Sequence, residues 1–310
     1  MRIMFMGTPE ISAGALGALI DAGHEVVAVV TGEDKPRGRG NVMTPTPTKR
    51  LALEKNIPVY TPKTLRDEAF ALLLSEIDPE LICVVAYGKI LPENVINFPK
   101  YGCINLHVSL LPKYRGAAPM QRAVMDGESE TGVTIMYMDV GLDTGDIIAS
   151  ERFTIGEEDD FETVHDTSLL IGSRLLSKTI YEIEAGRATR VKQDDSLATY
   201  AKKVEKEDCR IDFSPDAKIV SARIRGVTPI PGAFTFLNGK MLKVARVKAV
   251  KGSGKPGEVI EVDGAKEGSV TVACGSGAIR ILQVTPEGKG KMSAGDFVRG
   301  RKIAVGDILG

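Results

Sequence analysis

Residues 81–88 read LICVVAYG and residues 102–119 read GCINLHVSLLPKYRGAAP, which predicts two buried strands that each run into a turn. Side chains two positions apart in a strand point to the same face of the sheet. Asn105 and His107 therefore share one face at the carboxyl end of the second strand. The opposite face carries the apolar side chains of Ile104, Leu106 and Val108.

Apolar runs of this kind alternate with amphipathic runs through the N-terminal part of the chain. Strands are predicted at 2–7, 25–31, 58–60, 81–88, 103–109, 131–139 and 146–155. Helices are predicted near 11–22, 46–55, 65–77, 118–126 and 160–185. This alternation favours an α/β fold with a Rossmann-like parallel sheet that is covered by helices on both faces. Such sheets bind ligands beyond the carboxyl ends of their strands, where Asn105 and His107 lie.

The first predicted turn, GTPE at residues 7–10, does not have the pattern of a nucleotide-binding turn. A dinucleotide fingerprint needs three glycines in the spacing G-x-G-x-x-G, and this turn has a single glycine. NAD binding is therefore disfavoured.

The C-terminal third of the chain has a different pattern. Residues 187–205 have no sustained apolar period and are predicted to be a linker. After a short helix near 215–225, glycine-punctuated β-runs follow, with turns at 238–239 and 263–264 that suit hairpins. We therefore expect a catalytic domain at 1–186 and a small β-barrel of the oligonucleotide-binding (OB) kind at 206–310.

Length and composition fit a two-domain protein. With 310 residues, 43% hydrophobic and 26% charged, the chain can form two cores. No apolar run approaches the ~20 residues needed to span a bilayer, and no signal peptide is recognisable. We predict a cytoplasmic protein that does not bind membranes, and a monomer, because no apolar interface stripe is evident. Widely spaced cysteines predict neither a disulfide nor a zinc site: Cys83, Cys103, Cys209 and Cys274.

Charge separates the two parts of the chain. Residues 1–205 hold 22 Lys and Arg against 30 Asp and Glu, a net charge of −8. Residues 206–310 hold 18 against 11, a net charge of +7. A solvated surface without a partner would explain such an imbalance, but a basic barrel beside a catalytic domain is also suited to a phosphate backbone.

The polar residues after the strands suggest acyl-transfer chemistry. Asn105 and His107 can converge on one carbonyl oxygen, although an Asn-x-His pair by itself is more often a hydrogen-bonded structural pair. Asp143 follows 36 residues after His107 in a second polar turn, GLDTGD. A carboxylate that accepts one ring hydrogen fixes the histidine tautomer and makes the ring a better donor to a developing oxyanion. We expect no metal in this site.

The run SLLPKYRGAAP, with Asn-x-His before it and GLDTGD after it, resembles the folate-dependent formyltransferases. Across the whole chain the similarity is to their methionyl-tRNA formyltransferase branch. The motifs that carry it are MGTPE, VVAYGKILP, ETGVTIMYMDVGLDTGDI, RIDFS and RGVTPIPGAFT. Two departures are Val108, where the family most often has a small residue, and Phe213, where a tryptophan is more usual. We expect Val108 to adjust packing under the folate without abolishing catalysis, because it points away from the Asn/His face.

The resemblance implies transfer of the formyl group of 10-formyltetrahydrofolate to the amino group of initiator methionyl-tRNA, with tetrahydrofolate as the second product. Asn105 and His107 would hold the oxyanion, and Asp143 would keep His107 hydrogen-donating and help to move the proton. No covalent enzyme intermediate and no metal are required. The residues expected to bind the folate are Ser109, Leu110, Leu111, Pro112, Val85, Tyr87, Ile90 and Leu91.

A basic loop at residues 32–50, GEDKPRGRGNVMTPTPTKR, is too long for an ordinary connection of about 2–6 residues. The resemblance implies that this insertion engages the acceptor stem of the tRNA. Arg39, with Lys35 and Arg37, is the expected contact.

Two other functions remain open from the residues. A non-catalytic nucleic-acid-binding protein would account for the basic loop and barrel, but not for Asn105, His107 and Asp143. A hydrolase or a formyltransferase for a small amine could use the same three residues. The sequence does not identify the tRNA features that are read, or the barrel residues that read them.

Overall fold

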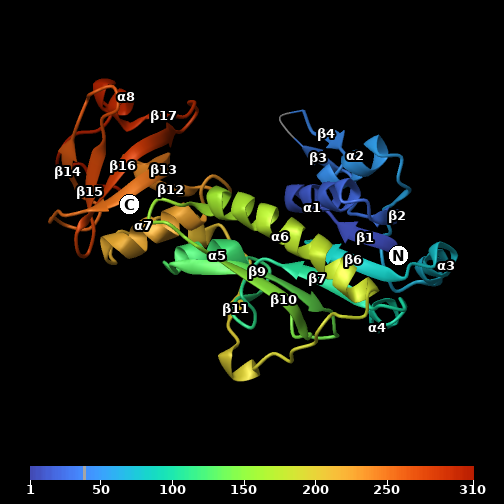
Figure 1. Ribbon diagram of the computed structural model, residues 1–310. Helices are drawn as coiled ribbons and strands as arrows, with labels where there is room; N and C mark the ends of the chain where they lie inside the picture. Colours follow the sequence, from blue (N-terminus) through green and yellow to red (C-terminus); the bar gives the residue numbers. More distant parts are fainter. Residues whose placement is uncertain (38–39) are drawn as a thin grey trace. The chain divides into compact units, whose positions relative to one another are not determined.

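The computed structural model describes residues 1–37 and 40–310, and it omits the side chain of Arg37 (Figure 1). Contacts divide the chain into two compact units. The first consists of Met1–Gly116, Gly132–Phe153 and His165–Tyr200. The second consists of Ala117–Thr131, Thr154–Val164 and Ala201–Gly310.

A seven-stranded sheet forms the centre of the first unit, in the order β10-β9-β7-β6-β1-β2-β5. Its strands are β1 (Arg2–Gly7), β2 (Glu25–Val30), β5 (Val59–Tyr60), β6 (Leu81–Val85), β7 (Cys103–His107), β9 (Glu130–Tyr137) and β10 (Ile147–Thr154). Strands β5, β2, β1, β6 and β7 are parallel, and β9 pairs with β7 in the antiparallel sense. Val84 of β6 lies beside Asn105, so the β6 and β7 turns emerge at the same edge of the sheet.

Helices cover both faces of this sheet (Figure 1). They are α1 (Glu10–Asp21), α2 (Pro47–Glu54), α3 (Glu68–Ile77), α4 (Glu93–Ile96) and α6 (Phe161–Glu184). A Cβ atom at Gly172 of α6 would lie 3.0 Å from Leu106, so the Leu106 face of β7 packs on this helix. Cys103, on the opposite face, belongs to a core cluster with residues of α3 and α4. Asn105 and His107 continue that second face toward the end of the strand.

The second unit contains α5 (Pro119–Met125), α7 (Ala217–Gly226) and α8 (Ala294–Arg299). Its antiparallel strands are β12 (Ala233–Leu237), β13 (Lys240–Val250), β14 (Val259–Val262), β15 (Val270–Ala273), β16 (Ala278–Pro286) and β17 (Met292–Ser293). The order is β12-β13-β16-β15-β14, with β17 on β16. The last residues close this sheet, because Leu309 bridges Leu237 of β12 and Ile308 bridges Glu258 beside β14.

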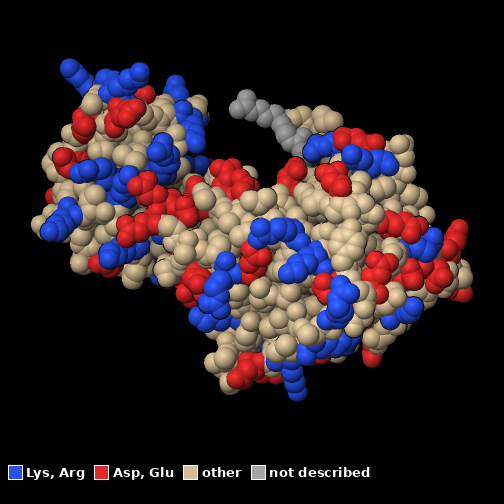
Figure 2. Space-filling view, viewed as in Figure 1, with Lys and Arg blue, Asp and Glu red and all other residues tan. Residues whose placement is uncertain are grey.

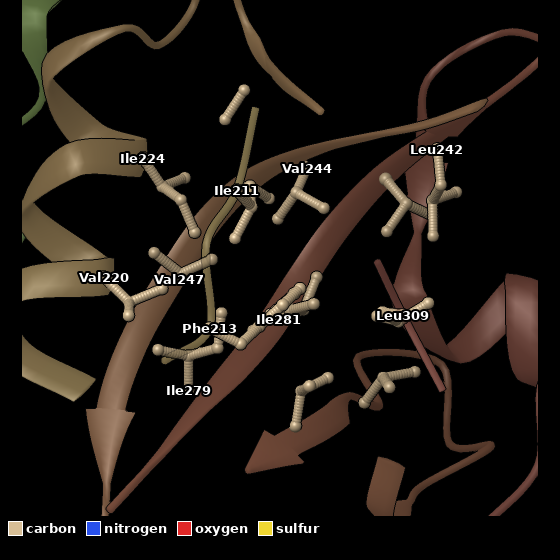
Figure 3. Packing of buried hydrophobic residues seen from close by; sticks show 14 of the residues in the cluster. Ile211, Phe213, Val220, Ile224, Leu242, Val244, Val247, Ile279, Ile281 and Leu309 are labelled. Atoms are coloured by element: carbon tan, nitrogen blue, oxygen red, sulfur yellow. The ribbon is translucent and has the colours of Figure 1, made fainter. Parts of the chain in front are cut away.

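The core of the second unit lies between these strands and α7 (Figure 3). Val220 and Ile224 of α7 face Val247, Ile279 and Ile281 of the sheet. Phe213 also lies in this cluster, as does Met125 of α5. The helix predicted near 118–126 therefore contributes to the core of the second unit, although the strands on either side of it in the sequence belong to the first.

The predicted fold class, α/β with a Rossmann-like parallel sheet followed by a small OB-like β-barrel domain, is confirmed: a sheet with five parallel strands precedes a domain of antiparallel strands. Several strands end one to three residues earlier than predicted, among them the two that lead into the predicted site. β6 stops at Val85, because Ala86 and Gly88 adopt positive φ angles of 45° and 81° that break the strand. β7 stops at His107 instead of residue 109. Within the described residues, no helix is both long and apolar enough to cross a membrane.

Candidate active site

Asn105 and His107 lie at the carboxyl end of β7 and, as strand alternation requires, on the same face of the sheet. Both are nearly buried, with 9% and 5% of their surfaces exposed. β7 is held on one side by β6 and on the other by β9, where Met136 faces Asn105 and Thr134 faces His107. Two ladders of backbone hydrogen bonds therefore fix the positions of both side chains.

The His107 ring lies between two acceptors. Its Nε2 atom is 3.0 Å from the carbonyl oxygen of Tyr114, which can only accept a hydrogen bond. Its Nδ1 atom is 3.7 Å from Oδ2 of Asp143, which is within ion-pair range but too long for a hydrogen bond. Nε2 can therefore donate its hydrogen to the Tyr114 carbonyl, while Nδ1 faces the Asp143 carboxylate. Catalytic hydrogen bonds are often long without substrate and tighten when it binds.

Asp143 is held by backbone geometry around it. Its φ angle is +54°, in the left-handed region that aspartate tolerates better than most residues. Its Oδ2 atom accepts a 2.7 Å hydrogen bond from the backbone N–H of Gly116. Asp139 caps the start of the same loop by accepting from the N–H of Gly141 and the hydroxyl of Thr144. The carboxylate therefore stays at a fixed place beside His107.

Ser109 organises the turn after β7. The residue is fully buried, and its hydroxyl donates to the carbonyl of Lys113 at 2.7 Å. The Thr134 hydroxyl donates to the carbonyl of Ser109 and accepts from the N–H of Leu111. A serine whose hydroxyl is engaged in this way shapes the SLLP turn and is not arranged as a nucleophile.

The turn after β6 is supported by the first turn of the chain. The Ser12 hydroxyl donates to the carbonyl of Val85 at 2.6 Å, and the Thr8 hydroxyl donates to that of Tyr87 at 3.2 Å. A Cβ atom at Gly7 would lie 2.6 Å from Cβ of Ser12 and 2.7 Å from the Val85 oxygen. Glycine is therefore required at this position for the two turns to approach each other.

The residues expected to line the folate pocket lie in different environments. Val85, Tyr87 and Leu91 are buried, and the last two pack in the core cluster under α3 and α4. Burial raises the pKa of the Tyr87 hydroxyl to about 12. Ile90, by contrast, is 81% exposed. Of the SLLP residues, Leu111 is buried with Ser109, while Leu110 and Pro112 are partly exposed.

Two residues that sequence reasoning did not place in the site connect its loops. Gln193 is buried, and its Nε2 atom donates to the carbonyls of Asp143 at 2.8 Å and Gly145 at 2.7 Å. Its Oε1 atom accepts from Nε and Nη2 of Arg115 at 3.1 and 2.8 Å. Arg115 is 2% exposed. Gln193 lies within the segment that the sequence suggested as a linker, and a single glutamine in a polar run gives no periodic signal.

Two family models match this chain. Residues 1–180 match the model of the family described as formyl transferase, and residues 203–302 match its C-terminal domain. The chain belongs to the formyl transferase family. The predicted membership is thereby confirmed, together with the prediction that the chain is a formyltransferase enzyme.

The curated relatives match along the whole chain. The methionyl-tRNA formyltransferase of Geotalea daltonii is 48% identical over 310 residues, covering 100% of this chain and 98% of the relative. That of Pelotomaculum thermopropionicum is 46% identical over 313 residues, covering 100% and 99%. The chain thus aligns with these methionyl-tRNA formyltransferases over nearly their full length.

Solved structures share the fold at lower identity. An N-formyltransferase from Helicobacter canadensis, in complex with folinic acid and dTDP-3-aminofucose, has a TM-score of 0.67 and 18% identity, covering 91% of this chain and 98% of that one. HypX from Aquifex aeolicus in complex with tetrahydrofolic acid has a TM-score of 0.65 and 19% identity, covering 96% and 47%. These likenesses support the fold alone.

The basic loop contains a hairpin. Strands β3 (Lys35–Arg37) and β4 (Val42–Thr44) pair in the antiparallel sense, and Lys35 is exposed. Arg39, the expected tRNA contact, lies outside the described residues, and the side chain of Arg37 is not described. Val42 and Met43 on β4 are 68% and 61% exposed. A hairpin within the insertion explains why the connection is longer than a simple turn.

Basic and acidic side chains are mixed on the second unit (Figure 2). Arg122 pairs with Asp208 at 2.7 Å, and both atoms are partly buried. Lys248 pairs with Glu158, and Arg299 with Asp296. Of these pairs, only Lys248–Glu158 offsets net positive charge of residues 206–310, because Arg122 lies outside that range and both members of Arg299–Asp296 lie inside it. Across the described residues, no group of three or more His, Cys, Asp or Glu side chains is arranged to hold a metal ion.

The Asp143 loop allows a first prediction. A Cβ atom at Gly145 would lie 1.8 Å from the carbonyl oxygen of Tyr137, so Gly145→Ala must displace the loop backbone. Displacement of a catalytic group by about 1 Å can lower turnover about 10²-fold, and we expect a loss of that order in kcat. Gly290→Ala is the control, because a Cβ atom there meets no atom within 4 Å. Equal kcat values for the two variants would contradict the prediction.

Proposed function

We propose that this chain transfers the formyl group of 10-formyltetrahydrofolate to the amino group of methionine on initiator methionyl-tRNA. The observation that carries the proposal is the convergence of Asn105, His107 and Asp143 at the carboxyl end of β7, in a chain that matches methionyl-tRNA formyltransferases over its full length. These residues are the catalytic group of the proposal.

The chemistry assigns a role to each residue. A neutral amine attacks the formyl carbon, negative charge develops on the formyl oxygen, and the amine must lose a proton. The Asn105 amide donates one hydrogen bond to that oxygen. The His107 ring donates a second from Nε2, which on substrate binding leaves the Tyr114 carbonyl that it contacts at 3.0 Å. Asp143, whose Oδ2 atom is 3.7 Å from Nδ1 of His107, keeps the ring hydrogen-donating and takes part in the proton transfer. The departing folate nitrogen leaves protonated, which balances the proton lost by the amine.

The folate would be held by the turns beside β6 and β7. Ala86 and Gly88 are exposed and have positive φ angles, so the main chain of this turn is open to a flat, polar ring edge. The buried side chains of Tyr87 and Leu91 support this turn from below. The co-substrate supplies an activated formyl carbon. The protein supplies its orientation, the oxyanion donors and the proton acceptor.

The molecule that accepts the formyl group distinguishes the proposed reaction from its alternatives. Purified chain with 10-formyltetrahydrofolate should release tetrahydrofolate rapidly with methionyl-tRNA, and slowly with water alone or with a nucleotide-linked amino sugar. Faster release with water would indicate a hydrolase. Faster release with the amino sugar would indicate a small-amine formyltransferase, and either result would overturn the proposed acceptor.

The basic hairpin is proposed to contact the end of the acceptor stem through Arg39, with Lys35 and Arg37 beside it. A charge-assisted hydrogen bond contributes about 1.5–3 kcal/mol. Arg39→Ala is therefore expected to lower kcat/KM for initiator methionyl-tRNA by about 10–150-fold, while KM for the folate stays unchanged. Arg66→Ala removes the same charge from an exposed position outside the hairpin and is the control.

The same assay should compare initiator with elongator methionyl-tRNA. The wild type is expected to prefer the initiator, and Arg39→Ala is expected to reduce this preference. Equal rates of the wild type on both tRNAs would contradict the initiator assignment. An unchanged preference in Arg39→Ala would place recognition outside this hairpin.

The proposal also covers where the chain acts, its oligomeric state and its independence of metal. The chain acts in the cytoplasm, where its proposed tRNA substrate is charged, and it acts as a monomer. The transfer requires no metal, because Asn105, His107 and Asp143 together supply the oxyanion donors and the proton acceptor. Formylation should continue at an unchanged rate in EDTA.

A further inference from the structure

Gln193 lies between the two loops that carry the candidate catalytic groups. Its orientation is fixed by its neighbours, since carbonyl oxygens can only accept and a guanidinium can only donate. The amide nitrogen therefore faces the carbonyls of Asp143 and Gly145, and the amide oxygen faces Arg115. All four hydrogen bonds lie between 2.7 and 3.1 Å.

Asp143 is fixed at its carboxylate and at its backbone carbonyl. The backbone N–H of Gly116 fixes its carboxylate, and Gln193 fixes its backbone carbonyl. Arg115, the residue next to Gly116, in turn fixes Gln193. The loop that carries Asp143 needs such support, because Asp143 has a positive φ angle. Two residues later, the backbone at Gly145 lies so close to Tyr137 that a Cβ atom would be 1.8 Å from the Tyr137 carbonyl oxygen.

Hydrogen bonds on both sides of Gln193 in the sequence hold its segment between these two loops. The Thr199 hydroxyl accepts from the N–H of Tyr114, and its carbonyl accepts from the N–H of Arg115. Ile147 and Val191 exchange a pair of backbone hydrogen bonds. The segment from Val191 to Thr199 is thus attached at both ends to the loops around the site.

We propose that Gln193 is a positioning residue for formyl transfer, acting on the reaction through Asp143. The inference rests on the proposed function of Asp143. The alternative is a purely structural residue that only satisfies the buried guanidinium of Arg115. The two roles depend on different atoms of the same amide, because Nε2 holds the Asp143 loop and Oε1 holds Arg115.

Gln193→Glu separates these roles. A glutamate keeps the acceptor for Arg115 but replaces the donor with an oxygen that faces two carbonyls. We expect kcat for formylation of methionyl-tRNA to fall at least about 10-fold, with KM for 10-formyltetrahydrofolate within twofold and an unchanged circular dichroism spectrum. Asp195→Asn is the control, since it weakens the other contact of Arg115 at 2.7 Å and leaves the amide of Gln193 in place. Its kcat should equal that of the wild type.

Gln193→Met provides a second variant if the glutamate does not fold, and it should show the same fall in kcat with unchanged folate KM. A folded Gln193 variant with a kcat within twofold of the wild type would overturn the inference. Asp143→Ala is measured in parallel. Full activity of Asp143→Ala would contradict the proposed catalytic role itself, whereas loss of activity in Asp143→Ala with normal Gln193→Glu would overturn the positioning role alone.

Discussion

Replacing His107 by alanine is expected to lower the rate of formyl transfer by about 10²–10³-fold. Removal of one oxyanion donor costs roughly 2.7–4 kcal/mol in the transition state. His107 is nearly buried and lies between Asp143 and the Tyr114 carbonyl, so neither water nor a neighbouring side chain can easily replace its hydrogen bond. The measurement is the single-turnover rate with saturating 10-formyltetrahydrofolate and methionyl-tRNA.

Asn105→Ala and Asp143→Ala should each lower the same rate by about 10²-fold or more. The control for loss of an imidazole is His165→Ala, because His165 lies on α6 and bonds the adjacent Asp166 at 2.9 Å. This variant should retain the wild-type rate. A nearly normal rate for His107→Ala, in protein with an unchanged circular dichroism spectrum, would remove the central catalytic assignment.

Phe213→Ala is expected to lower the free energy of unfolding of the second unit by about 3–5 kcal/mol, the usual cost of deleting a buried phenyl ring. Phe213 is 4% exposed and lies within the cluster formed by α7 and the barrel strands (Figure 3). Its replacement leaves a cavity that the closed sheet cannot fill without losing its register. Urea unfolding, followed by a probe placed in the second unit, measures the change.

Ile219→Ala is the matched control for this stability prediction. Ile219 lies on α7 but is 45% exposed, so its truncation should change the free energy of unfolding by no more than about 0.5 kcal/mol. A Phe213→Ala variant as stable as Ile219→Ala would mean that the aromatic ring is not part of this core.

Local sequence patterns were sufficient to predict the arrangement of Asn105 and His107. Strand alternation places both on one face of β7, and the apolar neighbours on the other face include Leu106, which packs on Gly172 of α6. The longer helices were predicted to within a few residues, because amphipathic periodicity depends on neighbours in the chain. The short helices α4 and α8 were not predicted.

Contacts between distant residues were not predictable in this way. Gln193 is separated from Asp143 by 50 positions and from Arg115 by 78, and no pattern in the polar run around it indicates burial. The hydrogen bond from the Gly116 N–H to Asp143 uses a backbone atom that no residue type reveals. Met125 packs in the core of the second unit because α5 contacts α7. The two helices are so close at Gly226 of α7 that a Cβ atom there would lie 2.4 Å from Cγ of Met125.

The folate residues illustrate a third limit. Ile90 and Leu91 are adjacent and equally apolar, yet the first is 81% exposed and the second 4%. They lie after β6 in a segment without regular structure, where alternation does not apply. Their environments depend on the positive φ angles at Ala86 and Gly88, which direct the chain after the strand.

The central claim is that one formyl group passes from the folate to the amino group of methionyl-tRNA for each folate consumed. The most direct test is to quantify tetrahydrofolate and formyl-methionyl-tRNA in the same reaction over time. We predict that the two products form in a one-to-one ratio, and that both disappear together in Asn105→Ala, His107→Ala and Asp143→Ala. Release of tetrahydrofolate without an equal amount of formyl-methionyl-tRNA would contradict the account.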